Sequence, residues 1–102
     1  MVKKINFREA GRLLRERGNC VLLDVREEAE YITGHAIDAL LLPVDEITRE
    51  RAAAILPDKT VPILLYCRSG RRSRRAAALL DSYGYEELYD LGSLIGWPYG
   101  LE

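Results

Sequence analysis

Short apolar runs alternate along the chain with segments of helical periodicity, and this alternation constrains the fold more than any other feature. The runs cover residues 20–25, 37–42, 61–66 and 87–91. Continuous runs of this length are typical of strands that are buried on both faces. Helices between such strands indicate a mostly parallel central sheet flanked by helices on both faces. We therefore expect an α/β fold, as a single domain over residues 1–102, which is enough chain for one hydrophobic core.

Helices are predicted at four places between these runs. Asn6 and Glu9 have the spacing of a capping box in front of the first helix, and Gly18 is placed to end that helix in a left-handed conformation. The other three helices are expected at residues 27–32, 49–56 and 73–83. Thr48 is a suitable cap for the helix over 49–56, and Gly84 is placed to end the last helix.

The chain carries 15 Lys and Arg against 16 Asp and Glu, a formal net charge of −1. This balance argues against a nucleic-acid partner, because nucleic-acid-binding domains are usually strongly basic. Two cysteines and one histidine are too few for a disulfide framework or a His-rich metal site, so we expect no metal and no cofactor. The longest apolar stretch is too short to span a bilayer. A reduced, cytoplasmic location is expected, and Leu101-Glu102 could be an expression remnant.

One segment departs from this balance of charge. Residues 68–75 hold five arginines and no acidic residue, so the rest of the chain, with 10 basic and 16 acidic residues, has a formal charge of −6. Cys67 stands directly before this segment, at the end of an apolar run, and a helix follows. Free N–H groups of the loop and of the first helical turn can converge on the sulfur atom. The pattern predicts a nucleophilic thiolate in an anion-binding loop; a solvated basic helix start beside a buried cysteine is the alternative.

The same segment resembles the CxxGxRS active-site loop of rhodanese-like sulfurtransferases, and it reads Cys67-Arg68-Ser69-Gly70-Arg71-Arg72-Ser73. Further elements match the family pattern in order and spacing: Asp24-Val25-Arg26, Glu30-Tyr31, Gly34-His35, Pro43, Leu91-Gly92 and Gly96-Trp97. Two positions depart from the pattern, because Asp38 and Ser93 stand where glycines are usual. The resemblance implies a rhodanese-like three-layer architecture.

Membership of this family would make the chain a thiosulfate sulfurtransferase. The resemblance implies a ping-pong reaction in which Cys67 takes the sulfane sulfur of thiosulfate, or of a similar small anionic donor, as a persulfide. A thiol, cyanide or a thioredoxin-like protein would then accept the sulfur. Two alternatives stay open: a persulfide carrier with little turnover on small donors, and a regulatory rhodanese-like binding module. A cysteine phosphatase is disfavoured, because its longer loop would need an arginine where this chain has Ser73.

The rest of the loop is assigned to the substrate-binding site: Arg68, Ser69, Gly70, Arg71, Arg72 and Ser73. Arg68 and Arg71 are expected to contact the anionic donor through their side chains, and Arg72 to orient the loop. Ser73 is expected to cap the following helix. The two arginines after it would then lie in the first helical turn, where cations are unfavourable.

Four residues outside the loop also receive roles. Asp24 and Arg26 end a strand at the same edge of the sheet and are expected to support the loop through hydrogen bonds. An ion pair of Arg26 with Glu30, four residues further on, is the simpler alternative. Cys20 is expected to be a buried structural thiol, and His35 to have a structural role beside a turn.

Overall fold

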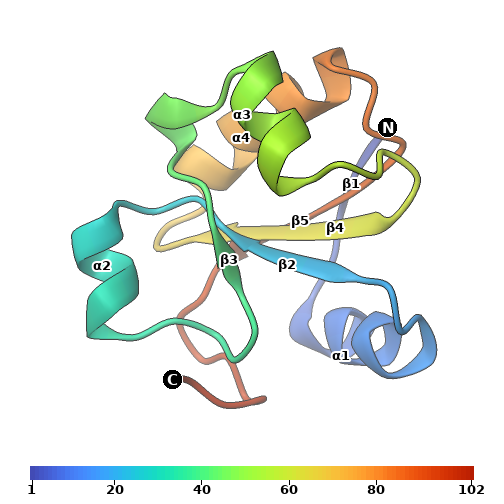
Figure 1. The fold of residues 1–102 in the computed structure, drawn as a ribbon. Coiled ribbons are helices and arrows are strands. Elements are labelled where there is room, and N and C mark those ends of the chain that lie inside the picture. The colour runs from blue at the N-terminus through green and yellow to red at the C-terminus, as the bar shows by residue number, and fades with distance from the viewer.

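The computed structural model describes residues 1–102 and contains one sheet of five strands in the order β1-β5-β4-β2-β3 (Figure 1). The strands are β1 (Val2–Lys4), β2 (Val21–Asp24), β3 (Leu40–Leu41), β4 (Pro62–Cys67) and β5 (Glu87–Ser93). Every neighbouring pair of strands is parallel. The predicted α/β fold class, with a parallel central sheet, is therefore confirmed.

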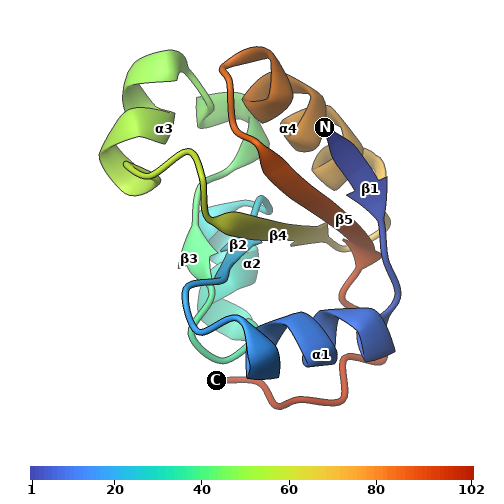
Figure 2. The same cartoon turned by 90° about the vertical axis from the view of Figure 1, so that its right-hand side faces the viewer.

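Helices cover both faces of the sheet, as Figures 1 and 2 show. α3 (Arg49–Ile55) and α4 (Arg71–Ser82) lie on one face, and α1 (Phe7–Glu16) lies on the other. α2 (Glu28–Thr33) follows β2 and lies beyond its carboxyl end. The three layers expected from the family resemblance are present. No helix has the length and apolar character needed to cross a membrane.

The central strand β4 divides its side chains between two apolar cores. Successive side chains of a strand point to opposite faces of the sheet, so Ile63, Leu65 and Cys67 join the core under α3 and α4. Leu64 and Tyr66 join the smaller core on the side of α1. All six residues of β4 are buried. The strand therefore delivers Cys67 to the carboxyl edge of the sheet on the face that α4 covers.

Two of the strand predictions were wrong. β1 was missed, because the three residues of Val2–Lys4 are exposed and show no apolar run. The strand expected over 37–42 shrinks to Leu40–Leu41, because a turn comes first. In that turn Asp38 has a φ of 67°, and the N–H of Ala39 donates a hydrogen bond to the carbonyl of Ala36.

The capping box of α1 is confirmed, because Asn6 and Glu9 each accept a hydrogen bond from the backbone N–H of the other. The role of Gly18 was wrong. The helix ends at Glu16, its C-cap is Arg17 in an extended conformation, and Gly18 is not left-handed. A hydrogen bond from the N–H of Cys20 to the carbonyl of Arg17 turns the chain directly into β2. Thr48 caps α3, and Gly84 follows α4 with a φ of 94°, both as expected.

The last two residues are integrated into the fold rather than set apart from it. Leu101 forms an antiparallel bridge with Ala36. Glu102 and His35 exchange two backbone hydrogen bonds, of 2.8 and 3.0 Å. The segment after β5 therefore returns to the loop between α2 and β3, on the face of the sheet that α1 covers.

Candidate active site

The sulfur atom of Cys67 lies inside the turn that joins β4 to α4. Cys67 is fully buried, and its Sγ accepts hydrogen bonds from the N–H of Gly70, at 2.9 Å, and from the N–H of Ser73, at 3.4 Å. The second of these donors is in the first turn of α4, where backbone N–H groups have no partner within the helix. Two fixed donors and the positive end of a helix thus face one sulfur atom.

Gly70 makes this approach possible. It is the N-cap of α4 and has φ and ψ of 97° and −10°, a left-handed conformation that costs other residues energy. A Cβ at this position would also lie 3.5 Å from the Cα of Gly92 on β5. The active-site loop and β5 therefore approach each other closely at Gly70 and Gly92.

Ser73 is not the helix cap, and that prediction was wrong. α4 begins two residues earlier than expected, at Arg71, so Ser73 occupies its third position. The side chain is buried, and its hydroxyl group donates to Oδ1 of Asp90 at 2.7 Å, with the carbonyl of Gly70 3.1 Å away. The first turn thus carries Arg71 and Arg72, whereas the two arginines after Ser73 lie beyond it.

Asp90 is a site residue that the sequence analysis missed. Its carboxylate is almost fully buried and accepts hydrogen bonds from Ser73 and, at 2.9 Å, from the N–H of Gly92. It therefore links β5 to the first turn of α4. The sequence does contain a signal for Asp90. Leu88, Asp90 and Gly92 are alternate positions of one strand and share its buried face, so a charged residue at the middle position needs a buried partner.

The side chain of Arg72 pairs with Glu30 on α2. Its Nη1 and Nη2 atoms donate to the two carboxylate oxygens of Glu30, at 2.6 and 3.0 Å. The guanidinium group lowers the pKa of Glu30 from its ordinary value to about 2. Glu30 therefore does not form the ion pair with Arg26 that was the alternative interpretation, and its pair with Arg72 ties the start of α4 to α2.

Asp24 and Arg26 form a buried network with Tyr66 and Gly34, and the expected hydrogen bonds from their side chains to the loop over 67–73 are not found. The carboxylate of Asp24 is fully buried and accepts from Nε and Nη2 of Arg26, the latter at 2.6 Å. It also accepts from the hydroxyl group of Tyr66 at 2.6 Å. Burial and this carboxylate raise the pKa of Tyr66. Arg26 further donates to the carbonyl of Gly34 at 2.7 Å, so its guanidinium group is held in place on two sides.

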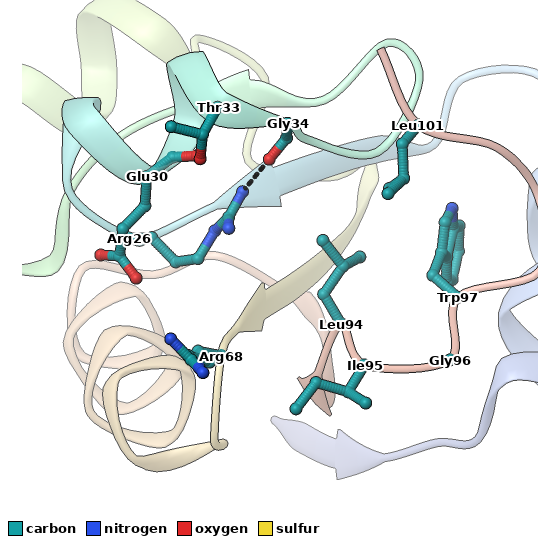
Figure 3. A pocket seen from close by; sticks show the side chains of 10 residues that line it. All are labelled: Arg26, Glu30, Thr33, Gly34, Arg68, Leu94, Ile95, Gly96, Trp97 and Leu101. Atoms are coloured by element: carbon teal, nitrogen blue, oxygen red, sulfur yellow. Dashed lines mark hydrogen bonds between the residues drawn. The ribbon is translucent and has the colours of Figure 1, made fainter.

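The arginines that were expected to meet the donor line two different cavities. Arg68 lines a cavity of about 440 Å³, here called the Arg68 cavity, together with Arg26, Glu30, Leu94, Ile95 and Trp97 (Figure 3). Arg71 lines another, of about 500 Å³, the Arg71 cavity, together with Lys4, Ser69, Gly70, Arg74 and Gly92. Arg75 pairs with Asp45 at 3.0 Å. The structure thus separates Arg68 from Arg71.

The sequence agrees with one family over most of its length. The family model of the rhodanese-like domain matches residues 8–97. The chain belongs to the rhodanese-like domain family.

Several relatives of this rhodanese-like domain are named sulfurtransferases, and one is named a tRNA uridine(34) hydroxylase. A protein from Allochromatium vinosum named sulfurtransferase is 37% identical over 98 residues, which are 95% of this chain and 89% of the relative. The thiosulfate sulfurtransferase GlpE of Coxiella burnetii is 34% identical over 91 residues, which are 89% of this chain and 81% of the relative. Both support a sulfurtransferase activity of the rhodanese type.

The fold comparison agrees. The solution structure of the rhodanese-like domain of the Anabaena protein Alr3790 superposes on this chain with a TM-score of 0.86. The superposition includes 100% of this chain and 80% of the Alr3790 chain, at 26% sequence identity. Its sequence identity is low, so this likeness concerns mainly the arrangement of the sheet and helices. The arrangement of sheet and helices is the three-layer architecture that the family resemblance implied.

The second cysteine and the histidine of the domain lie away from the sulfur atom of Cys67. Cys20 is half-buried, its thiol donates to the carbonyl of Leu13 at 3.4 Å, and burial raises its pKa. His35 stacks on Tyr31 with 3.6 Å between ring centroids, and its Nδ1 lies 2.8 Å from the carbonyl oxygen of Tyr31. The structure gathers no group of three His, Cys, Asp or Glu side chains that could hold a metal ion.

Proposed function

We propose that the domain transfers sulfane sulfur from a small anionic donor, such as thiosulfate, through a persulfide on Cys67. The observation that carries the proposal is the pair of backbone N–H donors, from Gly70 and Ser73, that converge on one buried sulfur atom. Hydrogen bonds to a thiolate favour its charged, nucleophilic form. The same donors suit the negative outer sulfur of a persulfide.

The donor half-reaction follows from this geometry. The Cys67 thiolate attacks the outer sulfur of thiosulfate, a new S–S bond forms, and the S–S bond of the donor breaks. The bonding electron pair leaves with sulfite, and Cys67 keeps one additional sulfur atom as a persulfide. Arg68, Arg71 and Arg74 form no ion pair in the structure. Their uncompensated charge supports an anionic donor and an anionic leaving group.

The acceptor half-reaction returns the enzyme to its starting state. A thiolate attacks the outer sulfur of the persulfide, the S–S bond to Cys67 breaks, and Cys67 leaves as a thiolate. The acceptor can be a small thiol or a thioredoxin-like protein. A reducing, cytoplasmic location forms part of the proposal, because both cysteines are free in the structure and the reaction needs Cys67 as a thiol.

Intact mass measurement after mixing with thiosulfate tests the proposal. The wild-type chain and Cys20→Ser are expected to gain one sulfur atom, and Cys67→Ser is expected to gain none. Cys20→Ser is the matched control, because it removes the other free thiol and leaves the loop untouched. No gain in the wild type, or an equal gain in Cys67→Ser, would refute the persulfide.

A persulfide carrier is the alternative function, and turnover separates it from an enzyme. The comparison is the rate of sulfite release with thiosulfate and dithiothreitol against the rate of the single loading step. Sustained sulfite release at a similar rate supports the enzyme. Complete loading followed by negligible release would favour the carrier.

A further inference from the structure

We propose that the Arg68 cavity binds the sulfur acceptor, and that this acceptor is a small organic thiolate with an apolar group. The inference rests on the proposed persulfide chemistry of Cys67 and names the class of its second substrate. It is carried by three observations: the amphipathic lining of the cavity, the single uncompensated charge in it, and the hydrogen bonds that attach its apolar wall to the active-site loop.

The cavity has a charged side and an apolar side. Figure 3 shows Arg26, Glu30 and Arg68 facing Leu94 and Ile95, with Trp97 and Leu101 at the far end. Ile95 is 74% exposed, so its apolar surface is open to a ligand in the cavity. The volume of about 440 Å³ lies in the range of sites for small organic ligands, and it far exceeds what a five-atom anion needs.

Only one charge in this cavity lacks a partner. Arg26 is paired with Asp24, and Glu30 is paired with Arg72. Arg68 forms no ion pair, and it is the residue directly after Cys67. A ligand that fits this layout has its negative atom beside Arg68, the residue that follows Cys67, and an apolar body along Leu94 and Ile95. A thiolate with an apolar substituent has this distribution of charge.

The apolar wall is attached to the reacting cysteine through the backbone. The N–H of Leu94 donates to the carbonyl of Cys67 at 2.9 Å. The hydroxyl group of Ser93 donates to the carbonyl of Arg68 and accepts from the N–H of Ile95 at 3.1 Å. Ser93 stands where the family pattern has a glycine, which could form neither side-chain hydrogen bond. This chain therefore fixes the position of Ile95 relative to Cys67 with a residue of its own.

The chemical step balances without a further reactant. The acceptor thiolate RS⁻ attacks the outer sulfur of the Cys67 persulfide anion and forms the bond of RSS⁻. The bond between that sulfur and the sulfur of Cys67 breaks, and its electron pair stays on Cys67 as a thiolate. The thiolate and the persulfide anion are both negative, and so are the two products, RSS⁻ and the Cys67 thiolate. The positive charge of Arg68 offsets the repulsion between the two anions before and after the transfer.

The test compares two alkanethiols of similar nucleophilicity, phenylmethanethiol and 2-sulfanylethanol. For each, kcat/KM as an acceptor is measured at saturating thiosulfate and divided by the fraction of thiolate. The wild type is expected to favour phenylmethanethiol at least about tenfold, the preference that a small apolar group earns in an apolar pocket. Because the result is a ratio within one variant, a general loss of activity cancels.

Variants of the wall locate the preference. Ile95→Ser is expected to reduce the ratio to below about threefold, Ser93→Gly to reduce it in the same direction, and Ile95→Leu to keep it. Ile32→Ser is the matched control, because Ile32 is 72% exposed on α2 and does not line the cavity.

Each outcome has a separate meaning for the acceptor and for the persulfide. A wild-type ratio near one, a ratio that Ile95→Ser leaves unchanged, or a ratio that Ile32→Ser lowers equally would overturn the acceptor assignment while the persulfide stands. Transfer to neither thiol from a loaded protein would overturn it as well. Failure of Cys67 to load at all would refute the proposed function, and the acceptor assignment with it.

Discussion

Replacing Tyr66 by phenylalanine removes one oxygen atom from the network that holds Arg26. This hydroxyl group donates to Oδ2 of Asp24 at 2.6 Å and accepts from the N–H of Ala36 at 3.1 Å. Both partners, Asp24 and Ala36, are fully buried. The substitution leaves the ring in place, so it creates almost no cavity and tests the hydrogen bonds alone.

The expected loss of stability is about 3 kcal/mol. A hydrogen bond to a charged group contributes roughly 1.5–3 kcal/mol, and a buried N–H left without a partner costs roughly 1–3 kcal/mol. These two effects of Tyr66→Phe share one site and do not add fully. Tyr85→Phe provides the matched control, because Tyr85 is also buried and donates at 2.6 Å, but to the neutral carbonyl of Leu56. There we expect a loss of about 1 kcal/mol.

Urea unfolding measures both losses, with Trp97 fluorescence and far-UV circular dichroism as independent probes. The slopes of the two variants should equal that of the wild type, because neither substitution changes the surface exposed on unfolding. If Tyr66→Phe and Tyr85→Phe lower the free energy of unfolding equally, the charge of Asp24 and the N–H of Ala36 add no stability beyond that of a neutral hydrogen bond. The account of the network around Arg26 would then be wrong.

Three further predictions concern the loop and its supports. Gly70→Ala forces a side chain into a left-handed conformation and is expected to lower the free energy of unfolding by about 1 kcal/mol in urea and to slow sulfur loading measured by intact mass. The pair of Arg72 with Glu30 lowers the pKa of Glu30, so its contribution to the free energy of unfolding should be lost as the pH falls from 4.5 through about 2. In acid titrations Glu30→Gln should lack this part of the pH dependence, and a profile equal to that of the wild type would contradict the prediction. Ser73→Ala leaves the carboxylate of Asp90 with one donor fewer and should cost about 1–3 kcal/mol in the same urea assay, whereas a loss below about 0.5 kcal/mol would contradict the link.

The sequence predicted the central strands because their signal is local. Three consecutive residues of β2 and all six of β4 are buried, and both strands lie in apolar runs that can be recognised from the local sequence alone. β1 has no such run: its three exposed residues become a strand only because they pair with Leu88, Tyr89 and Asp90 of β5, far away in the chain. A strand defined by its partner cannot be found from its own composition.

The site shows the same division between local and distant information. The motif around Cys67 predicted the loop and the candidate nucleophile, because strand, glycine and helix start lie within a few residues of each other. The supports of the loop come from elsewhere: Glu30 from α2 and Asp90 from β5. Ser73 was given the cap because serine usually has that role. Gly70 is the cap instead, and the serine hydroxyl group is free to bind a carboxylate from another strand.

The contacts of β5 have a consequence for the order of events during folding. A nascent chain that ends before Glu87 already contains the complete motif of Cys67 and Ser73, but it lacks Asp90 and Leu94, which hold the two ends of the turn. β1 also has to wait, because it pairs only with β5. Insertion of β5 between β1 and β4 therefore closes the sheet and completes the surroundings of the sulfur atom. The cysteine thus enters the chain before the residues that complete its surroundings.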